Sequence, residues 1–134
     1  MKRRKRFSTH IEDEMATGFD QTTRNDILER AGSTGEWVCC ERCGTWTDTV
    51  QVHHRRPRGS GGSTAADTNL ITNGFALCPT CHRHVESYRD EAYANGWLVA
   101  AGVDPAAVPV LRRGVLTMLY DDGTVSPDEA AGLF

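Results

Sequence analysis

The chain has 134 residues, enough for one domain or for one compact core with extensions at both ends. Its hydrophobic content of 39% and its 13 glycines predict a loop-rich core, which at this size often needs a metal or disulfide staple. No run approaches the roughly 18 apolar residues of a membrane-spanning helix. No apolar stretch follows the basic N-terminus, as it would in a secretory signal, so we expect a soluble cytoplasmic protein.

The first elements along the chain are a basic arm and a helix. Residues 1–20 carry five cations and no apolar periodicity, and they are predicted to form a flexible arm. A helix is expected from residue 22 or 23 to about residue 30. A threonine can cap it, Asp26 falls in its first turn, and Gly32 follows its end. Residues 21–36 are therefore assigned to this helix and its linker.

Two Cys-x-x-Cys pairs, Cys40 with Cys43 and Cys78 with Cys81, are the strongest motif in the chain. Two residues between thiolates let both sulfurs of a tight turn face one ion, and two such turns complete a tetrahedral zinc site. Five cysteines in a cytoplasmic chain are poor material for a disulfide framework. A redox role for either pair alone is the alternative, but it needs a βαβ context that the sequence lacks. We expect one structural zinc, with Cys39 as a buried bystander.

The region between and after these pairs alternates strand, loop and helix signals. Residues 45–53 alternate β-forming and polar residues and are predicted to form a strand. A glycine-rich loop is expected at residues 59–62, and a short helical turn at residues 67–71. The second cysteine pair leads into a helix predicted from residue 79 or 80 to residue 94, which Asn95 and Gly96 close.

Residues 97–134 are predicted to form a C-terminal extension. It contains an extended segment at residues 105–109 and a β-hairpin at residues 115–125, turning at Asp121-Asp122-Gly123. Its role is interpreted as packing or as docking of a partner. The three tryptophans of the chain are interpreted as core residues, and they are Trp37, Trp46 and Trp97.

Histidines at three positions suggest a second metal site. His53 and His54 are adjacent in an extended segment, so their side chains point to opposite sides. One can face a divalent ion while the other activates an attacking water. His82 directly follows the last cysteine, and Glu86 lies one helical turn further on the same face. Both could bind the same ion, Glu86 directly or through water.

This pattern resembles the zinc-containing HNH endonucleases over roughly residues 37–95. The residues that carry the resemblance are Cys40, Cys43, Val52, His53, His54, Pro57, Gly61, Gly62, Asn69, Leu70, Leu77, Cys78, Cys81 and His82. It implies an α+β fold. The core of that fold, at residues 37–96, would be a small ββα-metal, treble-clef-like unit held together by the four-cysteine zinc site. Residues 96–99 and 104–106 are similar to segments of HNH proteins from actinobacterial phages.

The resemblance implies that His54 is the general base and that Asn69 orients it. It also implies that His53 and His82 bind one catalytic divalent cation. Many family members have aspartate where this chain has His53. Because imidazoles suit transition ions better than magnesium, the ion is left open among Mg²⁺, Mn²⁺, Ni²⁺, Co²⁺ and Zn²⁺.

The implied activity is hydrolysis of duplex DNA, by nicking or by double-strand cleavage. Although the net charge is −3, Arg55, Arg56 and Arg58 lie beside the histidine pair and are expected to contact DNA phosphates. By analogy, the protein would act in phage genome packaging beside a terminase, in the cytoplasm of the host cell. One alternative is a non-catalytic zinc module that binds nucleic acid or protein, and another is a packaging factor that cleaves only when bound to its partner.

Overall fold

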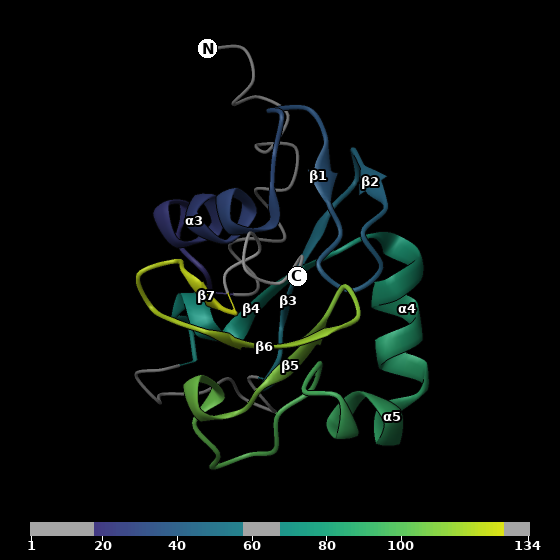
Figure 1. Ribbon diagram of the computed structural model, residues 1–134, viewed down its shortest axis with the longest axis vertical. Helices are drawn as coiled ribbons and strands as arrows, with labels where there is room; N and C mark the ends of the chain where they lie inside the picture. Colours follow the sequence, from purple (N-terminus) through teal and green to yellow (C-terminus); the bar gives the residue numbers. More distant parts are fainter. Residues whose placement is uncertain (1–17, 58–67, 128–134) are drawn as a thin grey trace.

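The computed structural model of the protein describes residues 18–57 and 68–127 (Figure 1). The predictions for residues 2–6, for Arg58 and for the loop at 59–62 lie outside these residues. The elements in chain order are α3 (Gln21–Ala31), β1 (Val38–Cys39), β2 (Trp46–Thr47), β3 (Gln51–His54), the 3₁₀ turn η1 (Ile71–Asn73), β4 (Gly74–Leu77), α4 (Pro79–Ser87), α5 (Arg89–Ala94), the 3₁₀ turn η2 (Pro105–Ala107), β5 (Val110–Arg112), β6 (Val115–Leu119) and β7 (Val125–Ser126).

Helix α3 begins slightly earlier than predicted, because Asp20 rather than a threonine caps it. The Asp20 carboxylate accepts a hydrogen bond from the backbone N–H of Thr23 at 2.7 Å. Asp26 therefore lies beyond the first turn, whereas Gly32, with a φ of 103°, ends the helix as expected. Phe19 is only 3% exposed, so the end of the predicted flexible arm belongs to the folded domain.

A ββα unit forms the centre of the molecule. Strands β3 and β4 pair antiparallel, with His53 opposite Phe75, and α4 follows β4 directly. The single strand predicted at residues 45–53 is divided into β2 and β3. The Thr49 backbone N–H donates to the Thr47 hydroxyl at 3.1 Å, which is a local turn that ends β2. The fold is therefore the mixed α+β type that the sequence predicts.

The helix predicted up to residue 94 is two helices, α4 and α5, separated at Tyr88. The backbone angles of Tyr88 are −116° and 69°, outside the helical region. Beyond the break, the carbonyl of Ala92 accepts hydrogen bonds from the N–H groups of Trp97 and Leu98. Asn95 closes α5, as predicted. The break thus turns the chain so that buried Ala92 can meet the segment that follows.

Two apolar clusters make up the core on the two sides of the β3–β4 ribbon. One joins α3 to Val38, Val52 and Ile71, and the other joins the cysteine pairs and α4 to the C-terminal sheet. Gly74 permits the close approach of α3, because a Cβ atom there would lie 2.2 Å from Ile27 Cδ1. Trp97 is buried as expected. The core interpretation is wrong for Trp37 and Trp46, which are 45% and 48% exposed.

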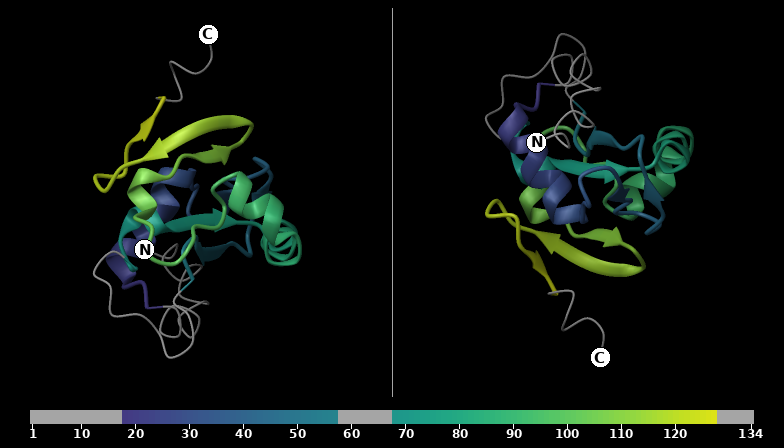
Figure 2. Two further views of the ribbon diagram at one scale, coloured as in Figure 1. Left: turned by 90° about the horizontal axis from the view of Figure 1, so that it is seen from below. Right: turned by 90° about the horizontal axis from the view of Figure 1, so that it is seen from above.

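The C-terminal segment is a three-stranded antiparallel sheet, β5–β6–β7, that forms a layer on one side of the ββα unit (Figure 2). The predicted hairpin is present as β6 and β7, with a turn at Gly123. A second turn, at Arg113 and Gly114, joins β5 to β6 and was not predicted; both residues have positive φ. The segment predicted as extended at 105–109 contains η2, which the Asp104 carboxylate caps.

Glu41, Arg30 and Arg112 form a buried cluster of charged side chains. Glu41 has no exposed surface, and its carboxylate accepts from Arg30 at 2.6 Å and from Arg112 at 2.9 Å. Burial alone would raise the pKa of Glu41, but the two guanidinium groups hold it below its ordinary value. The network ties α3 and β5 to the first cysteine turn. No helix in the described part of the chain is long and apolar enough to cross a membrane.

Candidate functional site

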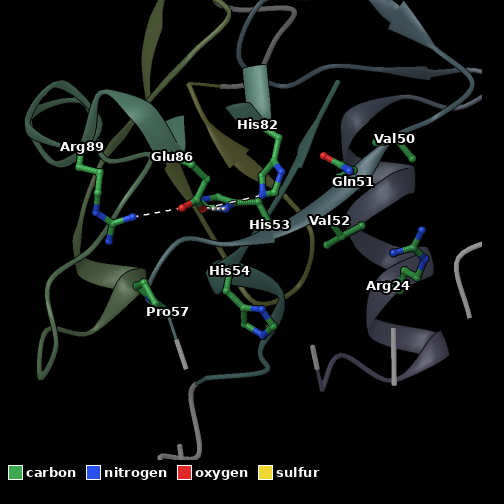
Figure 3. A pocket seen from close by; sticks show the side chains of 10 residues that line it. All are labelled: Arg24, Val50, Gln51, Val52, His53, His54, Pro57, His82, Glu86 and Arg89. Carbon is green, nitrogen blue, oxygen red and sulfur yellow. Dashed lines mark hydrogen bonds and ion pairs between the residues drawn. The ribbon is translucent and has the colours of Figure 1, made fainter. Parts of the chain in front are cut away.

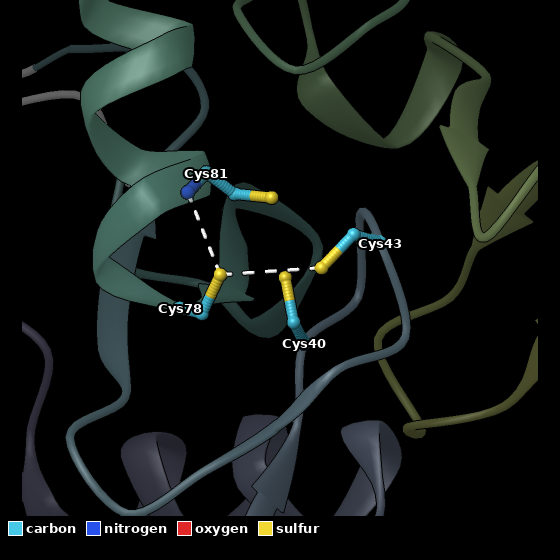
Figure 4. A group of neighbouring side chains, drawn as sticks. All are labelled: Cys40, Cys43, Cys78 and Cys81. Atoms are coloured by element: carbon cyan, nitrogen blue, oxygen red, sulfur yellow. Dashed lines mark hydrogen bonds between the residues drawn. The ribbon is translucent and has the colours of Figure 1, made fainter.

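Four cysteine sulfurs converge from two turns, as the sequence predicts (Figure 4). Cys40 and Cys43 lie on the turn after β1, and Cys78 and Cys81 lie at the start of α4. All four Sγ atoms are within 4.8 Å of one another, and those of Cys43 and Cys78 are 4.0 Å apart. Tetrahedral zinc with Zn–S bonds of about 2.3 Å separates its sulfur ligands by about 3.8 Å. The cluster therefore fits one zinc ion.

The surroundings of the cluster act differently on its thiols. Burial opposes ionisation of Cys43, but hydrogen bonds from Thr45 lower its pKa to about 7. Burial raises the pKa of the Cys40 and Cys81 thiols, so zinc has to displace protons from both. The Arg42 guanidinium donates to Cys81 Sγ at 3.1 Å and lies 4.3 Å from the centre of the Trp97 ring. This contact places a positive charge beside the thiolates that zinc binding would create.

A second cluster consists of His53, His82 and Glu86. One ligand atom from each lies within 4.8 Å of the other two. Glu86 Oε2 is 3.9 Å from His53 Nδ1 and 3.9 Å from His82 Nε2, and the three side chains face one another in Figure 3. Two imidazoles and a carboxylate are a donor set suited to first-row transition ions. The described residues thus fit a divalent cation at the place that the sequence predicts.

His53 is held in the tautomer that a metal ligand requires. Its Nε2 atom is 2.9 Å from the backbone carbonyl oxygen of Trp97. Because a carbonyl can only accept, Nε2 carries the proton and Nδ1 presents its lone pair towards Glu86. Burial lowers the pKa of His53 to about 3, against the opposing effect of the Trp97 carbonyl. The imidazole is therefore neutral at pH 7 and ready to bind a cation.

His54 points away from this cluster, as expected for neighbouring residues of a strand (Figure 3). Its Nε2 atom is 2.9 Å from the side-chain oxygen of Asn69. The His54 ring stacks on the ring of Phe19, with centroids 4.0 Å apart and an interplanar angle of 12°. Asn69 is the predicted partner of His54, and the structure brings the two together. The contact between His54 and Phe19 was not predicted.

Both histidine environments open onto one cavity of about 400 Å³. His53, His54, His82 and Glu86 line it, and the arginines Arg24 and Arg89 lie on opposite sides of it (Figure 3). Arg89 donates to Glu86 Oε1 at 3.2 Å. Of these two arginines, Arg24 is only 3% exposed and Arg89 is exposed. The cavity therefore combines the histidine side chains with one exposed cation, Arg89, that can reach a phosphate group.

The predicted phosphate contact of Arg55 is wrong. Arg55 has no exposed surface, and its guanidinium donates to backbone carbonyls at 2.8–3.1 Å, those of Thr72, Gly96, Pro105 and Val108. Burial lowers its pKa to about 10, so it remains charged at pH 7. Arg55 thus joins the strand to the C-terminal segment and does not reach DNA.

The same correction applies to Arg56, which is 7% exposed. Its guanidinium donates to the carbonyl of Val103 and to the hydroxyl of Thr68. From the sequence alone, an arginine next to the histidine pair could be exposed or buried. It can be buried only where carbonyls from distant segments accept its hydrogen bonds, and these partners are not visible in the local sequence. Arg58 lies outside the described residues.

Three residues were not predicted from the sequence: Arg24 and Arg89, which line this cavity, and Phe19, which stacks on His54. Arg24 lies three and four positions before the buried residues Ile27 and Leu28. An arginine on the buried face of an amphipathic helix is a signal that could have found it. Phe19 directly precedes the helix cap, a position where an apolar side chain often packs back onto the domain.

Residues 40–87 match the family model described as HNH endonuclease. The match covers less than half of the chain, and it includes both cysteine pairs, the histidine pair, Asn69, His82 and Glu86. Phe19, Arg24 and Trp97 lie outside it. Comparisons with curated proteins and with solved structures found no significant match. The match supports an HNH-type nuclease domain that acts on nucleic acid.

Proposed function

We propose that this protein is a metal-dependent endonuclease that hydrolyses phosphodiester bonds of duplex DNA, with His54 as the general base. The observation that carries the proposal is the cavity that the two histidines share. On one side His54 is paired with Asn69, and on the other side a neutral His53 faces a second imidazole and a carboxylate. A zinc module that only binds a partner needs the four cysteines but has no use for this arrangement.

The contact with Asn69 supports the role of His54. Because the amide oxygen accepts, it favours the tautomer in which Nε2 carries the proton and Nδ1 carries the lone pair. That nitrogen can take a proton from a water molecule as it attacks phosphorus. A histidine suits this task, since its ordinary pKa lies close to neutral pH. Asn69 holds the ring in place while the proton moves.

His53, His82 and Glu86 would hold the divalent cation. When bound, such an ion neutralises charge on the phosphoryl group and on the departing oxygen. The residues themselves set its place, because His53 is anchored through Trp97 and Glu86 shares its second oxygen with Arg89. Arg89, which is exposed at one side of the cavity, would contact a phosphate that flanks the scissile bond.

The finer parts of the proposal rest on the similarity to HNH proteins of actinobacterial phages. This similarity supports cleavage of DNA during phage genome packaging, beside a terminase and in the cytoplasm of the host cell. If the protein cleaves only with that partner, the isolated chain will be inactive and addition of terminase will restore nicking. A monomer would nick one strand, and a symmetric dimer could cut both.

The test is nicking of supercoiled plasmid in the presence of Mg²⁺, Mn²⁺, Ni²⁺, Co²⁺ or Zn²⁺. We expect His54→Ala to lower the rate about a hundredfold or more, the usual contribution of a general base. The matched control is His84→Ala, because His84 lies on the same α4 helix as the ligands but pairs with Glu91 at 2.9 Å. It should retain the wild-type rate. Equal metal-dependent nicking by His54→Ala and wild type would contradict the assignment of the base.

A further inference from the structure

Phe19 contacts His54, which lines the cavity, from outside the region that matches the family. It lies just before α3, its side chain is buried, and its ring is nearly parallel to the His54 imidazole. We propose that Phe19 is a positioning residue of the nuclease site, which holds the plane of the His54 ring while Asn69 holds one of its nitrogens. This inference rests on the proposed function and names a further residue that the reaction depends on.

The geometry explains why both contacts are needed. The hydrogen bond between Nε2 and Asn69 fixes one atom of the imidazole but not the plane of the ring. A flat ring stacked 4.0 Å away, at an angle of 12°, removes this freedom. A base displaced by about 1 Å from its productive position can lose about a hundredfold in rate. Phe19 therefore affects the chemical step without touching the substrate.

Phe19 itself has little room to move. A Cβ atom at Gly74 on β4 would lie 3.2 Å from Phe19 Cζ, so the tip of the ring rests against the strand. On the following side, Asp20 anchors the backbone to the start of α3. On the preceding side, Gly18 has a φ of 92°, and a Cβ atom there would lie 3.0 Å from the Asn69 amide. The segment at 18–20 thus lies against both His54 and Asn69.

Phe19→Leu tests the effect of the planar ring apart from the effect of apolar burial, because leucine keeps a buried hydrocarbon side chain but offers no planar face. The matched control is Ile27→Val, which removes one methylene from the same core cluster and leaves the stacked ring in place. Tyrosine is unsuitable at residue 19, because its hydroxyl would extend from Cζ towards Gly74. Melting temperatures of both variants show that they are folded and how far each is destabilised.

The first measurement is the kinetics of plasmid nicking. We expect Phe19→Leu to lower kcat about tenfold or more, with KM changed by less than about threefold, while Ile27→Val stays within about twofold of wild type. The second measurement is the NMR signals of the His54 ring protons. They should lie upfield in the wild type because of the Phe19 ring current, and they should move downfield in Phe19→Leu but not in Ile27→Val.

Equal kcat values for the two variants, or His54 signals that do not respond to Phe19→Leu, would overturn the inference. The NMR measurement needs no cleavage, so the two proposals can fail separately. If the wild type nicks with none of the ions and the His54 signals still respond, the proposed function fails, but Phe19 does hold the ring.

Discussion

The imidazole of His53 and the backbone carbonyl of Trp97 are 44 residues apart in the chain and 2.9 Å apart in the structure. Arg55 makes the same connection more strongly, since it donates to the carbonyls of Gly96, Pro105 and Val108. The first of the proposed metal ligands is thus oriented by a segment that begins beyond the predicted nuclease domain at 37–96. Residues 97–108 are part of the site's support.

A chain shortened to end at Gly96 is therefore expected not to fold. It would leave the buried guanidinium of Arg55 without the Pro105 and Val108 carbonyls, and a buried charge that loses its partners costs several kcal/mol. It would also remove Val110 and Leu119, which have almost no exposed surface. Circular dichroism during urea unfolding measures the outcome. A cooperative transition near the wild-type midpoint would show that the C-terminal segment is dispensable.

The carboxylate of Glu86 is expected to contribute to binding of the catalytic cation. Glu86→Gln removes the negative charge that faces His53 and His82. We expect the affinity for Mn²⁺ to fall at least about tenfold, since even the loss of an outer-shell partner costs about that much. Calorimetric titration of zinc-loaded protein gives the affinity. Glu91→Gln is the control, because Glu91 pairs with His84, and equal losses in both variants would argue against Glu86 as a ligand.

The low pKa of His53 predicts loss of stability in acid. Its pKa is about 3 in the folded protein against 6.5 ordinarily, so unfolding takes up a proton between these values and the free energy of unfolding falls as the pH drops from 6.5 to 3. The expected loss is about 2 kcal/mol between pH 7 and pH 5. Urea denaturation of metal-free protein measures it. His53→Gln should lose less over this range, and an identical loss in both would exclude His53 as the cause.

Zinc removal is expected to unfold the domain. The four cysteine side chains bring the first cysteine turn and the start of α4 together, and the free energy of binding a structural zinc is folding free energy. Cys78→Ala should lose zinc and show no cooperative melting transition. Cys39→Ala is the matched control, because Cys39 is buried next to the cluster but donates to the Gly44 carbonyl instead. Zinc content by atomic absorption distinguishes them, and a zinc-loaded, folded Cys78→Ala protein would contradict the site.

Local spacing explains which parts of the site the sequence could predict. The cysteine pairs and His53-His54 are recognisable because each set of neighbours is positioned by one turn or one strand. The burial of Arg55 was not predictable in the same way, because its four partner carbonyls come from three separate segments of the chain. The break at Tyr88 carries no glycine or proline, so tertiary packing overrides a continuous helical pattern there.

The exposed charges of the described residues are mostly acidic, which limits where affinity for DNA can come from. Among the lysines and arginines of residues 18–57 and 68–127, only Arg83 and Arg89 are exposed, whereas Glu29, Asp48 and Asp121 are among many exposed acids. The body of the protein therefore offers few contacts to a phosphate backbone. The five cations at residues 2–6 are the largest remaining group in the chain.

Replacing these five cations by glutamine should therefore weaken DNA binding and flatten its salt dependence. If all five contact phosphates, the slope of log K against log salt should become less steep by about 4 to 5, at about 0.9 per contact. Fluorescence anisotropy on a labelled duplex between 50 and 200 mM salt measures both quantities. The double variant Arg83→Gln/Arg89→Gln is the control and should change the slope by no more than about 2. If the five-fold variant keeps the wild-type slope while the control loses affinity, the DNA contacts lie on α4 and α5 rather than at the N-terminus.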